Sequence, residues 1–145
     1  IPKTLIQYVI EYYKSNASIA DIIDDILDTP ISPELLPHVD DEIVQETEEI
    51  VGAYELHDFF LYHFVKYGAH PTKIRFLAQL AFDGKYDEAT ITKWLKLFLR
   101  RFFTQQFKRS CMPDGPKVGT ISLSPRADWK MASDADVEIW LKELE

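Results

Sequence analysis

The stretch from Glu88 to Lys108, EATITKWLKLFLRRFFTQQFK, decides the fold. Its large apolar side chains recur at the spacing of one face of an α-helix. They are Trp94, Leu95, Phe98, Leu99, Phe102 and Phe103. Asp87, just before the stretch, is a residue type that caps helix N-termini. The pattern therefore predicts one long helix with a largely aromatic buried stripe.

Two helices are predicted upstream of it, on either side of a glycine. The first follows Gly52 and ends at Tyr67-Gly68, a common helix C-terminus. Its apolar face carries Leu56, Phe59, Phe60, His63 and Phe64. The second opens at Pro71-Thr72 and stops near Gly84, because proline suits the first turn of a helix.

Three more helices are predicted towards the ends of the chain. One covers residues 3–14 behind Pro2, and one covers residues 19–27 with Ser18 as its N-cap. The isoleucines of the second form a stripe: Ile19, Ile22, Ile23 and Ile26. Ser133-Asp134 caps the last helix, which carries Val137, Trp140 and Leu141. The fold class is mainly α, with about six helices.

Long irregular segments separate these helices. Residues 28–37 contain three prolines, and the acidic stretch 40–49 has few apolar anchors, so an extended segment and a solvated loop are expected there. Proline and glycine also break the periodicity from Ser110 to Ser133, where Val118–Leu123 permits at most one short strand. Loops of this length are usually functional or contact something outside the segment.

Composition excludes several classes of protein. The 145 residues are 46% hydrophobic and carry a net charge of −8, which favours a packed soluble protein and gives no support to nucleic-acid binding. No apolar run is long enough to span a membrane. The single cysteine, Cys111, excludes an internal disulfide and favours the reducing cytoplasm. The chain begins at Ile1 without methionine, as an excised fragment or a processed protein would.

The charge is unevenly distributed. No Lys or Arg lies between Lys14 and Lys66, where thirteen of the 24 acids occur; the rest of the chain, with 16 basic residues and 11 acids, is formally +5. Cations gather at Lys108, Arg109 and Lys117, near a helix end and a Pro/Gly loop. This arrangement fits an anion site, and it equally fits cations that complement the helix dipole. The four histidines have no metal-ligand spacing, and no nucleophile triad is apparent, so no catalytic or metal-binding residue is assigned.

Three runs of the sequence resemble the glutamine-dependent NAD+ synthetases. They are Tyr54–His63 (YELHDFFLYH), Arg100–Ser110 (RRFFTQQFKRS), and Pro113–Val118 (PDGPKV) continued by Ser122–Trp129 (SLSPRADW). Residues 2–6 (PKTLI) and 31–35 (ISPEL) are similar to the same family, in the same order. The resemblance covers essentially the whole chain.

The resemblance implies that residues 1–145 are the C-terminal part of a synthetase domain with an α/β, adenine-nucleotide α-hydrolase-like fold. That domain adenylates deamido-NAD+ with ATP and Mg2+, and ammonia released from glutamine by a separate glutaminase domain then displaces AMP. The family's Ser-Gly-Gly-X-Asp-Ser pyrophosphate loop has no counterpart here, nor have the glutaminase's catalytic residues. The chain alone is therefore expected to be inactive and to hold no cofactor.

Several residues take family roles by position. Lys108, with Phe107 beside it, matches the lysine that contacts deamido-NAD+, and Ser32 matches a hydroxyl residue near ATP. Arg109, Lys117 and Arg126 are possible anion contacts by charge and place. The expected partners are the rest of the synthetase domain, the glutaminase domain and further copies in a homo-oligomer, with no nucleic acid or membrane. A self-contained helical module that docks a partner protein is the alternative.

Overall fold

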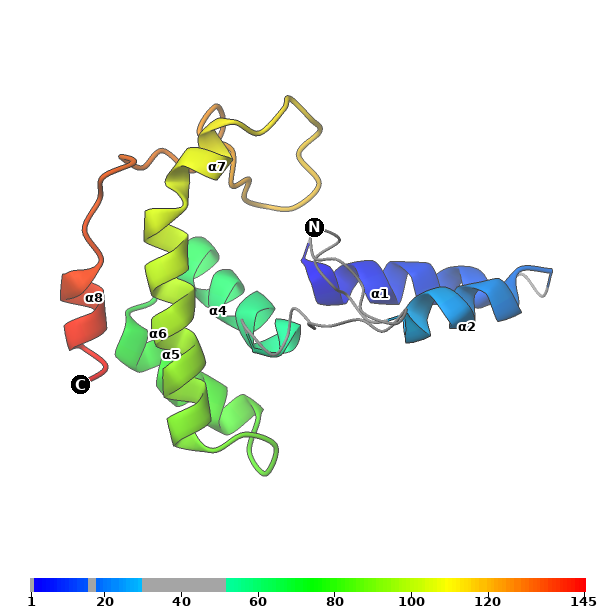
Figure 1. The fold of residues 1–145 in the computed structure, drawn as a ribbon, viewed down its shortest axis with the longest axis horizontal. Coiled ribbons are helices and arrows are strands. Elements are labelled where there is room, and N and C mark those ends of the chain that lie inside the picture. The colour runs from blue at the N-terminus through cyan, green and yellow to red at the C-terminus, as the bar shows by residue number, and fades with distance from the viewer. Residues whose placement is uncertain (1, 16–17, 30–51) are drawn as a thin grey trace, which may run out of the picture. The chain divides into compact units, whose positions relative to one another are not determined.

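The structure is a computed structural model that describes residues 2–15, 18–29 and 52–145. In these ranges the chain forms seven α-helices and a 3-10 turn and contains no β-strand (Figure 1). The mainly α fold class is thus confirmed. The chain forms two compact units, residues 1–58 and 59–145. Ser32, the proline-rich segment from residue 30 and the acidic stretch 40–49 lie outside the described residues.

The first unit contains α1 (Lys3–Tyr12), the 3-10 turn η1 (Tyr13–Ser15), α2 (Ala20–Asp28) and the first turn of α4 (Tyr54–Tyr67). Side chains of α4 hold the start of α1. The Asp58 carboxylate accepts hydrogen bonds from the Thr4 amide at 2.8 Å and the Thr4 hydroxyl at 2.6 Å. The Lys3 ammonium lies 5.7 Å from the centre of the Tyr54 ring. A carboxylate at this end of α1 also complements the helix dipole.

The N-cap predicted for α2 is wrong. The helix begins at Ala20, so Ile19 and not Ser18 is in the capping position. Asp21 in the first turn places a negative charge near the positive end of the helix dipole instead. Lys14 and Asp24 form an ion pair between η1 and α2, and this hydrogen bond raises the pKa of Lys14.

Much of the apolar surface of α1, η1 and α2 is exposed. Of the predicted isoleucine stripe, Ile23 is buried, but Ile22 and Ile26 are 60% and 53% exposed. The other exposed large apolar side chains of this region are Leu5, Ile6, Tyr8, Val9, Tyr12 and Tyr13. The periodicity correctly predicts amphipathic helices, but nothing in the described part of the chain covers these side chains.

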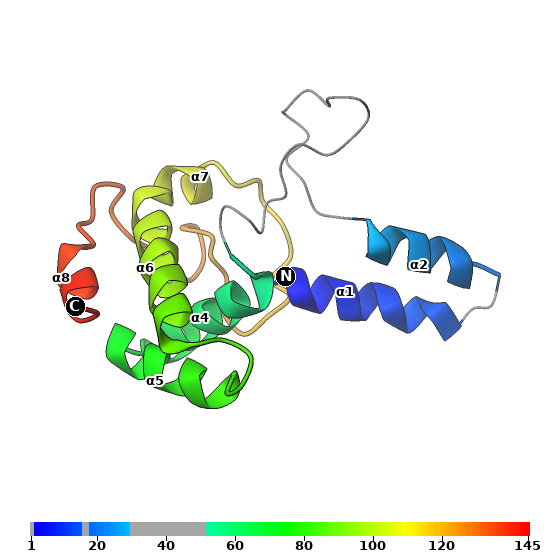
Figure 2. The same ribbon diagram turned by 60° about the horizontal axis from the view of Figure 1, so that its bottom comes forward.

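The second unit is built around α6 (Glu88–Thr104), with α5 (Pro71–Ala81) and α8 (Glu138–Lys142) packed against it (Figures 1 and 2). The predicted boundaries of α4 and α5 are confirmed. Gly68 ends α4 with a φ of 57°, and the Gly68 and Ala69 amides bond to the carbonyls of Phe64 and His63. This is the hydrogen-bond pattern of a left-handed glycine cap. Pro71 is the first residue of α5.

The core of the second unit is an aromatic cluster centred on Phe64. This ring is 4% exposed and contacts five other aromatic rings at centroid distances of 5.0–6.3 Å. They belong to Phe98, Phe102, Phe103, Trp129 and Trp140. Two of these rings come from the segment that follows α7 and from α8, so the cluster joins helices to a long loop. The predicted stripe of α6 is buried except for Trp94, which is half-buried, and Ile91 joins it.

The long helix predicted from Glu88 to Lys108 is interrupted. α6 ends at Thr104, Gln105 adopts φ −107° and ψ 24°, and the short helix α7 (Gln106–Ser110) follows. The break turns Gln106 inward, where its side chain is 1% exposed. An unbroken apolar periodicity cannot show this, because the break depends on polar contacts that Arg109 makes from α7 back to α6.

The C-terminal part departs from one sequence prediction, the cap of its helix. Val118–Leu123, where at most one short strand was expected, forms none, and its Ser122 amide donates to the side chain of Asp128 at 2.6 Å. α8 begins at Glu138, whose amide donates to Asp136, so Ser133-Asp134 is not its cap. None of the described helices is long and apolar enough to cross a membrane.

Asp87 caps α6 as predicted, and replacing it is expected to show a defined pH dependence. Its carboxylate accepts a 2.7 Å hydrogen bond from the Thr90 amide, and the side-chain and backbone hydrogen bonds of Thr90 lower the pKa of Asp87. We expect Asp87→Ala to lower the melting temperature by a few degrees at neutral pH. A depressed pKa stabilises the fold above the unfolded-state value near 3.8, and this contribution is lost as the pH falls through the folded value.

Asp87→Asn is the matched control, because asparagine caps a helix but does not titrate. Thermal unfolding of the three proteins is measured from pH 7 to pH 2. The melting temperature of the aspartate protein should exceed that of the alanine variant by less as the pH falls, whereas the difference between the asparagine and alanine variants should stay constant. An alanine deficit that is constant to pH 2 would contradict the assignment of the titration to Asp87.

Candidate functional site

The cationic segment predicted from the sequence comprises α7 and the loop that follows it. α7 is fixed to the end of α6 by Arg109. The Arg109 guanidinium donates to the Gln106 side-chain oxygen at 2.8 Å and to the carbonyl of Phe102, and its centre lies 4.1 Å from the centre of the Phe102 ring. Burial lowers the pKa of Arg109. Arg109 is thus directed back at the helix that precedes it.

Phe107 and Lys108 occupy the opposite side of the same short helix. Phe107 is 56% exposed, although phenylalanine is a residue type usually buried. Lys108 is exposed too, and among the described residues no acidic group pairs with it. Residues three apart share a helix face, so Gln106 and Arg109 face the protein while their two neighbours face outward. An exposed aromatic ring and an exposed ammonium group on one short helix suit an anionic ligand with an aromatic ring.

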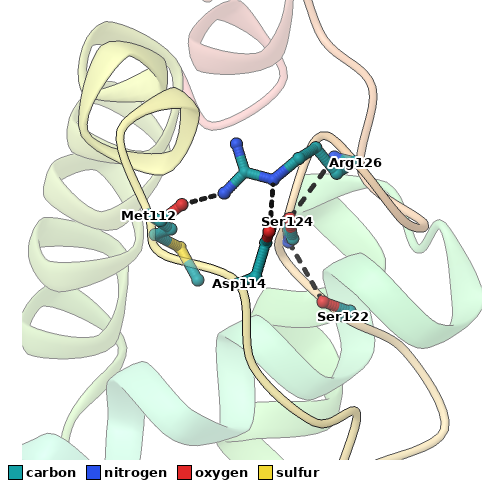
Figure 3. A network of polar contacts seen from close by, with 5 residues as sticks. All are labelled: Met112, Asp114, Ser122, Ser124 and Arg126. Atoms are coloured by element: carbon teal, nitrogen blue, oxygen red, sulfur yellow. Dashed lines mark hydrogen bonds and ion pairs between the residues drawn. The ribbon is translucent and has the colours of Figure 1, made fainter.

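The loop after α7 is closed by Arg126 (Figure 3). Its Nε donates to Asp114 at 2.8 Å, and a terminal guanidinium nitrogen donates to the carbonyl of Met112. The Arg126 amide donates to the Ser124 hydroxyl at 3.3 Å, and the Ser124 amide donates to the Ser122 hydroxyl at 3.1 Å. The two guanidinium contacts join the arms of the loop across twelve and fourteen residues, and the serine contacts are local to one arm.

Lys117 is held in the same loop by Asp128. The ammonium lies 2.7 Å from the carboxylate oxygen that also accepts from the Ser122 amide at 2.6 Å. The hydrogen bond from Lys117, followed by the one from Ser122, lowers the pKa of Asp128. Lys117 and Arg126 are therefore each paired with an acid of the loop, whereas Lys108 is not.

The loop returns to the core at Trp129. Its ring packs on Phe64 and Phe102, at centroid distances of 5.7 and 5.2 Å, and its amide donates to the Ser124 carbonyl at 3.3 Å. Two buried donors, Trp129 Nε1 and Gln106 Nε2, have no hydrogen-bond partner in the described part of the chain. The structure thus brings Lys108, Lys117 and Arg126 onto one helix–loop segment with Trp129 as its inner anchor.

Sequence reasoning missed the acids that organise this segment. Asp114 and Asp128 neutralise Arg126 and Lys117, and Gln106 receives Arg109. The sequence signal that could have indicated these ion pairs is the presence of acids within a Pro/Gly loop that also carries cations. Cys111 is exposed at the end of α7, and the described residues contain no group of three or more metal-ligating side chains.

The comparisons with known proteins cover the whole chain. It is 39% identical to the glutamine-dependent NAD(+) synthetase of Mycobacterium leprae and 38% identical to those of Mycobacterium tuberculosis and Mycobacterium bovis. The chain is a homologue of the glutamine-dependent NAD(+) synthetases. It spans about a quarter of the length of these relatives, 25% and 24%. No family model matches it.

The resemblance to glutamine-dependent NAD(+) synthetases seen in the motif runs is confirmed by these identities, which extend over 100% of the chain. The Arg100–Ser110 run contains the end of α6 and all of α7, and the later runs form the Arg126 and Lys117 network. The synthetase-like motifs therefore coincide with the segment that presents Phe107 and Lys108.

Proposed function

We propose that this chain is part of an ATP-dependent ligase that amidates deamido-NAD+ to NAD+ with ammonia drawn from glutamine. The observation that carries the proposal is the 38–39% identity to synthetases of that name along the whole chain. The ligase would adenylate the nicotinate carboxylate, and ammonia would displace AMP from the acyl-adenylate. Because the relatives are about four times longer, the complete activity is proposed for a longer polypeptide and not for residues 1–145 alone.

In this proposal Lys108 and Phe107 bind deamido-NAD+. The exposed Lys108 ammonium would meet an anionic group of the dinucleotide, either its pyrophosphate or its carboxylate, because charge-assisted hydrogen bonds are the stronger ones. The exposed Phe107 ring offers an apolar face to an aromatic base. Arg109 would act indirectly, by fixing α7 to α6. Lys117 and Arg126 would shape the loop that follows α7. They would contact an anion only if their ion pairs with Asp128 and Asp114 were broken.

ATP and Mg2+ are assigned mainly to other parts of the longer polypeptide. The described residues contain no acidic cluster that fits a metal, and the proposal gives none of them a contact with Mg2+. Ser32 stays a proposed ATP contact outside the described residues. The partners proposed are the remainder of the synthetase domain, the glutaminase domain and further copies of the same polypeptide, all in the cytoplasm.

The proposal is tested at Lys108 in the complete polypeptide that carries this chain. We expect Lys108→Ala to lower kcat/KM for deamido-NAD+ by about tenfold or more, through a raised KM or a lowered kcat, because one charged contact to the substrate is lost. Steady-state kinetics at saturating ATP and ammonia, with deamido-NAD+ varied, measure this. Its melting temperature should be unchanged, because no described residue pairs with Lys108.

Lys142→Ala is the matched control, since Lys142 also lies exposed in the last turn of a short helix. Its kinetics should equal those of the unchanged enzyme. An unchanged kcat/KM in Lys108→Ala would contradict the proposed contact of Lys108 with deamido-NAD+. An equal loss of kcat/KM in both variants would show a general effect of removing a positive charge.

The alternative, a self-contained helical interaction module, is favoured by one observation: the exposed apolar side chains of α1, η1 and α2. The same side chains suit burial against the rest of a synthetase domain, since exposed apolar surface usually marks a contact. The gene separates the two hypotheses. A Ser-Gly-Gly-X-Asp-Ser coding sequence upstream of residue 1 would support the ligase, and a reading frame that starts near residue 1 would support the module.

A further inference from the structure

The last turns of α4 carry a cluster of two tyrosines and a lysine that the proposed ligase chemistry does not use. Tyr62 and Tyr67 place their hydroxyl oxygens 3.1 Å apart, and the Lys66 ammonium donates to the Tyr62 oxygen at 3.3 Å. The same ammonium lies 5.0 Å from the centre of the Tyr62 ring and 5.5 Å from that of Tyr67. Tyr62 and Lys66 are four residues apart and so lie on one face of α4, and Tyr67 is the last residue of that helix.

The cluster favours ionisation of one phenol over the other. Hydrogen bonds from Tyr67 and then from Lys66 lower the pKa of Tyr62. The hydrogen bond to Tyr62 raises the pKa of Tyr67. The Lys66 ammonium donates to the Tyr62 oxygen, which favours the phenolate form of that oxygen. Within this pair, Tyr62 is thus the phenol that accepts from Lys66.

The surroundings of the cluster are cationic and aromatic. His63 packs against Phe59 and Tyr62, with ring centroids 4.4 and 5.2 Å apart, and burial followed by the charge of Lys73 lowers its pKa. His63 is thus a neutral neighbour near pH 7, and Lys73, from the first turn of α5, adds positive charge on that side. Among the described residues, Lys66 is the charged group that contacts the two tyrosines, whereas Lys73 acts on His63.

We propose that Tyr62 is a site of covalent modification, the tyrosine of this chain that preferentially accepts activated acyl groups. Its oxygen attacks the acyl carbon, the new oxygen–carbon bond forms and the bond from that carbon to the leaving group breaks. The proton of the phenol passes through solvent to the leaving group. This inference rests on α4 alone and is independent of the proposed ligase activity.

Exposure alone predicts other tyrosines. Tyr12 and Tyr8 are 77% and 69% exposed against 47% for Tyr62, and no described residue bonds to the hydroxyl of Tyr8. A reagent limited only by access would therefore label Tyr8 faster. A reagent that requires the phenolate distinguishes the two, because the hydrogen bonds of the cluster act on Tyr62 and not on Tyr8.

The test treats the full chain with N-acetylimidazole, which releases imidazole when it acylates a phenol, and maps the products by peptide mass spectrometry. At pH 7.5 we expect Tyr62 to be labelled at least about threefold faster than Tyr8, with the acetyl group removed by hydroxylamine as an ester is. Lys66→Met and Tyr67→Phe should each slow labelling of Tyr62 and move its rate profile to higher pH. Lys73→Met, the control lysine on α5, should leave the rate of Tyr62 unchanged.

Three outcomes would overturn the proposal. They are faster labelling of Tyr8 than of Tyr62, acetylation of Lys66 in place of Tyr62, and an unchanged Tyr62 rate in Lys66→Met. Tyr62, Lys66 and Tyr67 are all exposed, so their variants should keep the far-ultraviolet circular dichroism of the unchanged chain. If the spectrum of Lys66→Met changed, the labelling rate of Tyr62 in Tyr67→Phe would decide, because that variant lacks only a hydroxyl group.

Discussion

Phe64→Ala is expected to lower the free energy of unfolding of the second unit by about 3–5 kcal/mol, the range for truncating a buried phenylalanine. Phe64 is 4% exposed and contacts rings from α6, α8 and the loop that ends at Trp129. Its removal leaves a cavity that rings fixed on three separate segments cannot fill by a small movement. The loss should therefore include a cavity contribution as well as the transfer of the ring to water.

Urea unfolding followed by tryptophan fluorescence measures this change, since Trp129 and Trp140 both touch the Phe64 ring. Phe76→Ala is the matched control: Phe76 lies on α5 and is 57% exposed, so its replacement should change stability by less than about 0.5 kcal/mol. Similar losses in the two variants would contradict the placement of Phe64 at the centre of the core.

The features of the fold that follow from neighbouring residues were predictable. Asp87 caps α6 through Thr90, three residues away, and Gly68 ends α4 through carbonyls of the preceding turn. Pro71 begins α5 because its fixed φ suits a first turn. Each of these depends on a few residues along the chain, which is the information that a sequence pattern contains.

The features that failed depend on contacts between distant residues. Ser18 is a good capping residue by type, but α2 begins beyond it. Val118–Leu123 permits at most a short strand by its pattern, but a strand needs a neighbour, and here the Ser122 amide bonds to Asp128 instead. The sequence pattern also does not reveal that Ile22 and Ile26 are exposed, because it shows an apolar face and not what covers it.

The candidate site shows the same limit most clearly for its cations. Composition groups Lys108, Arg109, Lys117 and Arg126 as one basic segment, and the structure separates them by their contacts. Arg109 binds back to α6, and Lys117 and Arg126 are paired with loop acids. Lys108 has no acidic partner among the described residues. A sequence contains the charges of these residues, but their pairing depends on how the loop closes.

The separation of Arg109 from Lys108 can be measured as a difference in stability. Arg109→Ala removes the donor of the Gln106 side-chain oxygen, one donor to the Phe102 carbonyl and a guanidinium packed on the Phe102 ring. Gln106 is 1% exposed, so its oxygen would be left buried without this donor, and its nitrogen already has no partner among the described residues. We expect a loss of about 1.5–3 kcal/mol, the range for a hydrogen bond to a charged group.

Arg109→Lys should recover little of this loss, because one ammonium group cannot reach both acceptors and stack on the ring as the planar guanidinium does. Arg100→Ala, at an exposed position on α6, controls for the loss of a positive charge and should change stability by less than about 0.5 kcal/mol. Denaturant unfolding of the three variants decides the matter. If Arg109→Ala were no less stable than Arg100→Ala, Arg109 would not hold α7 and would be free to contact a ligand. If only the Arg109 variants lose stability, Arg109 fixes α7 in place and so determines the exposed position of Lys108.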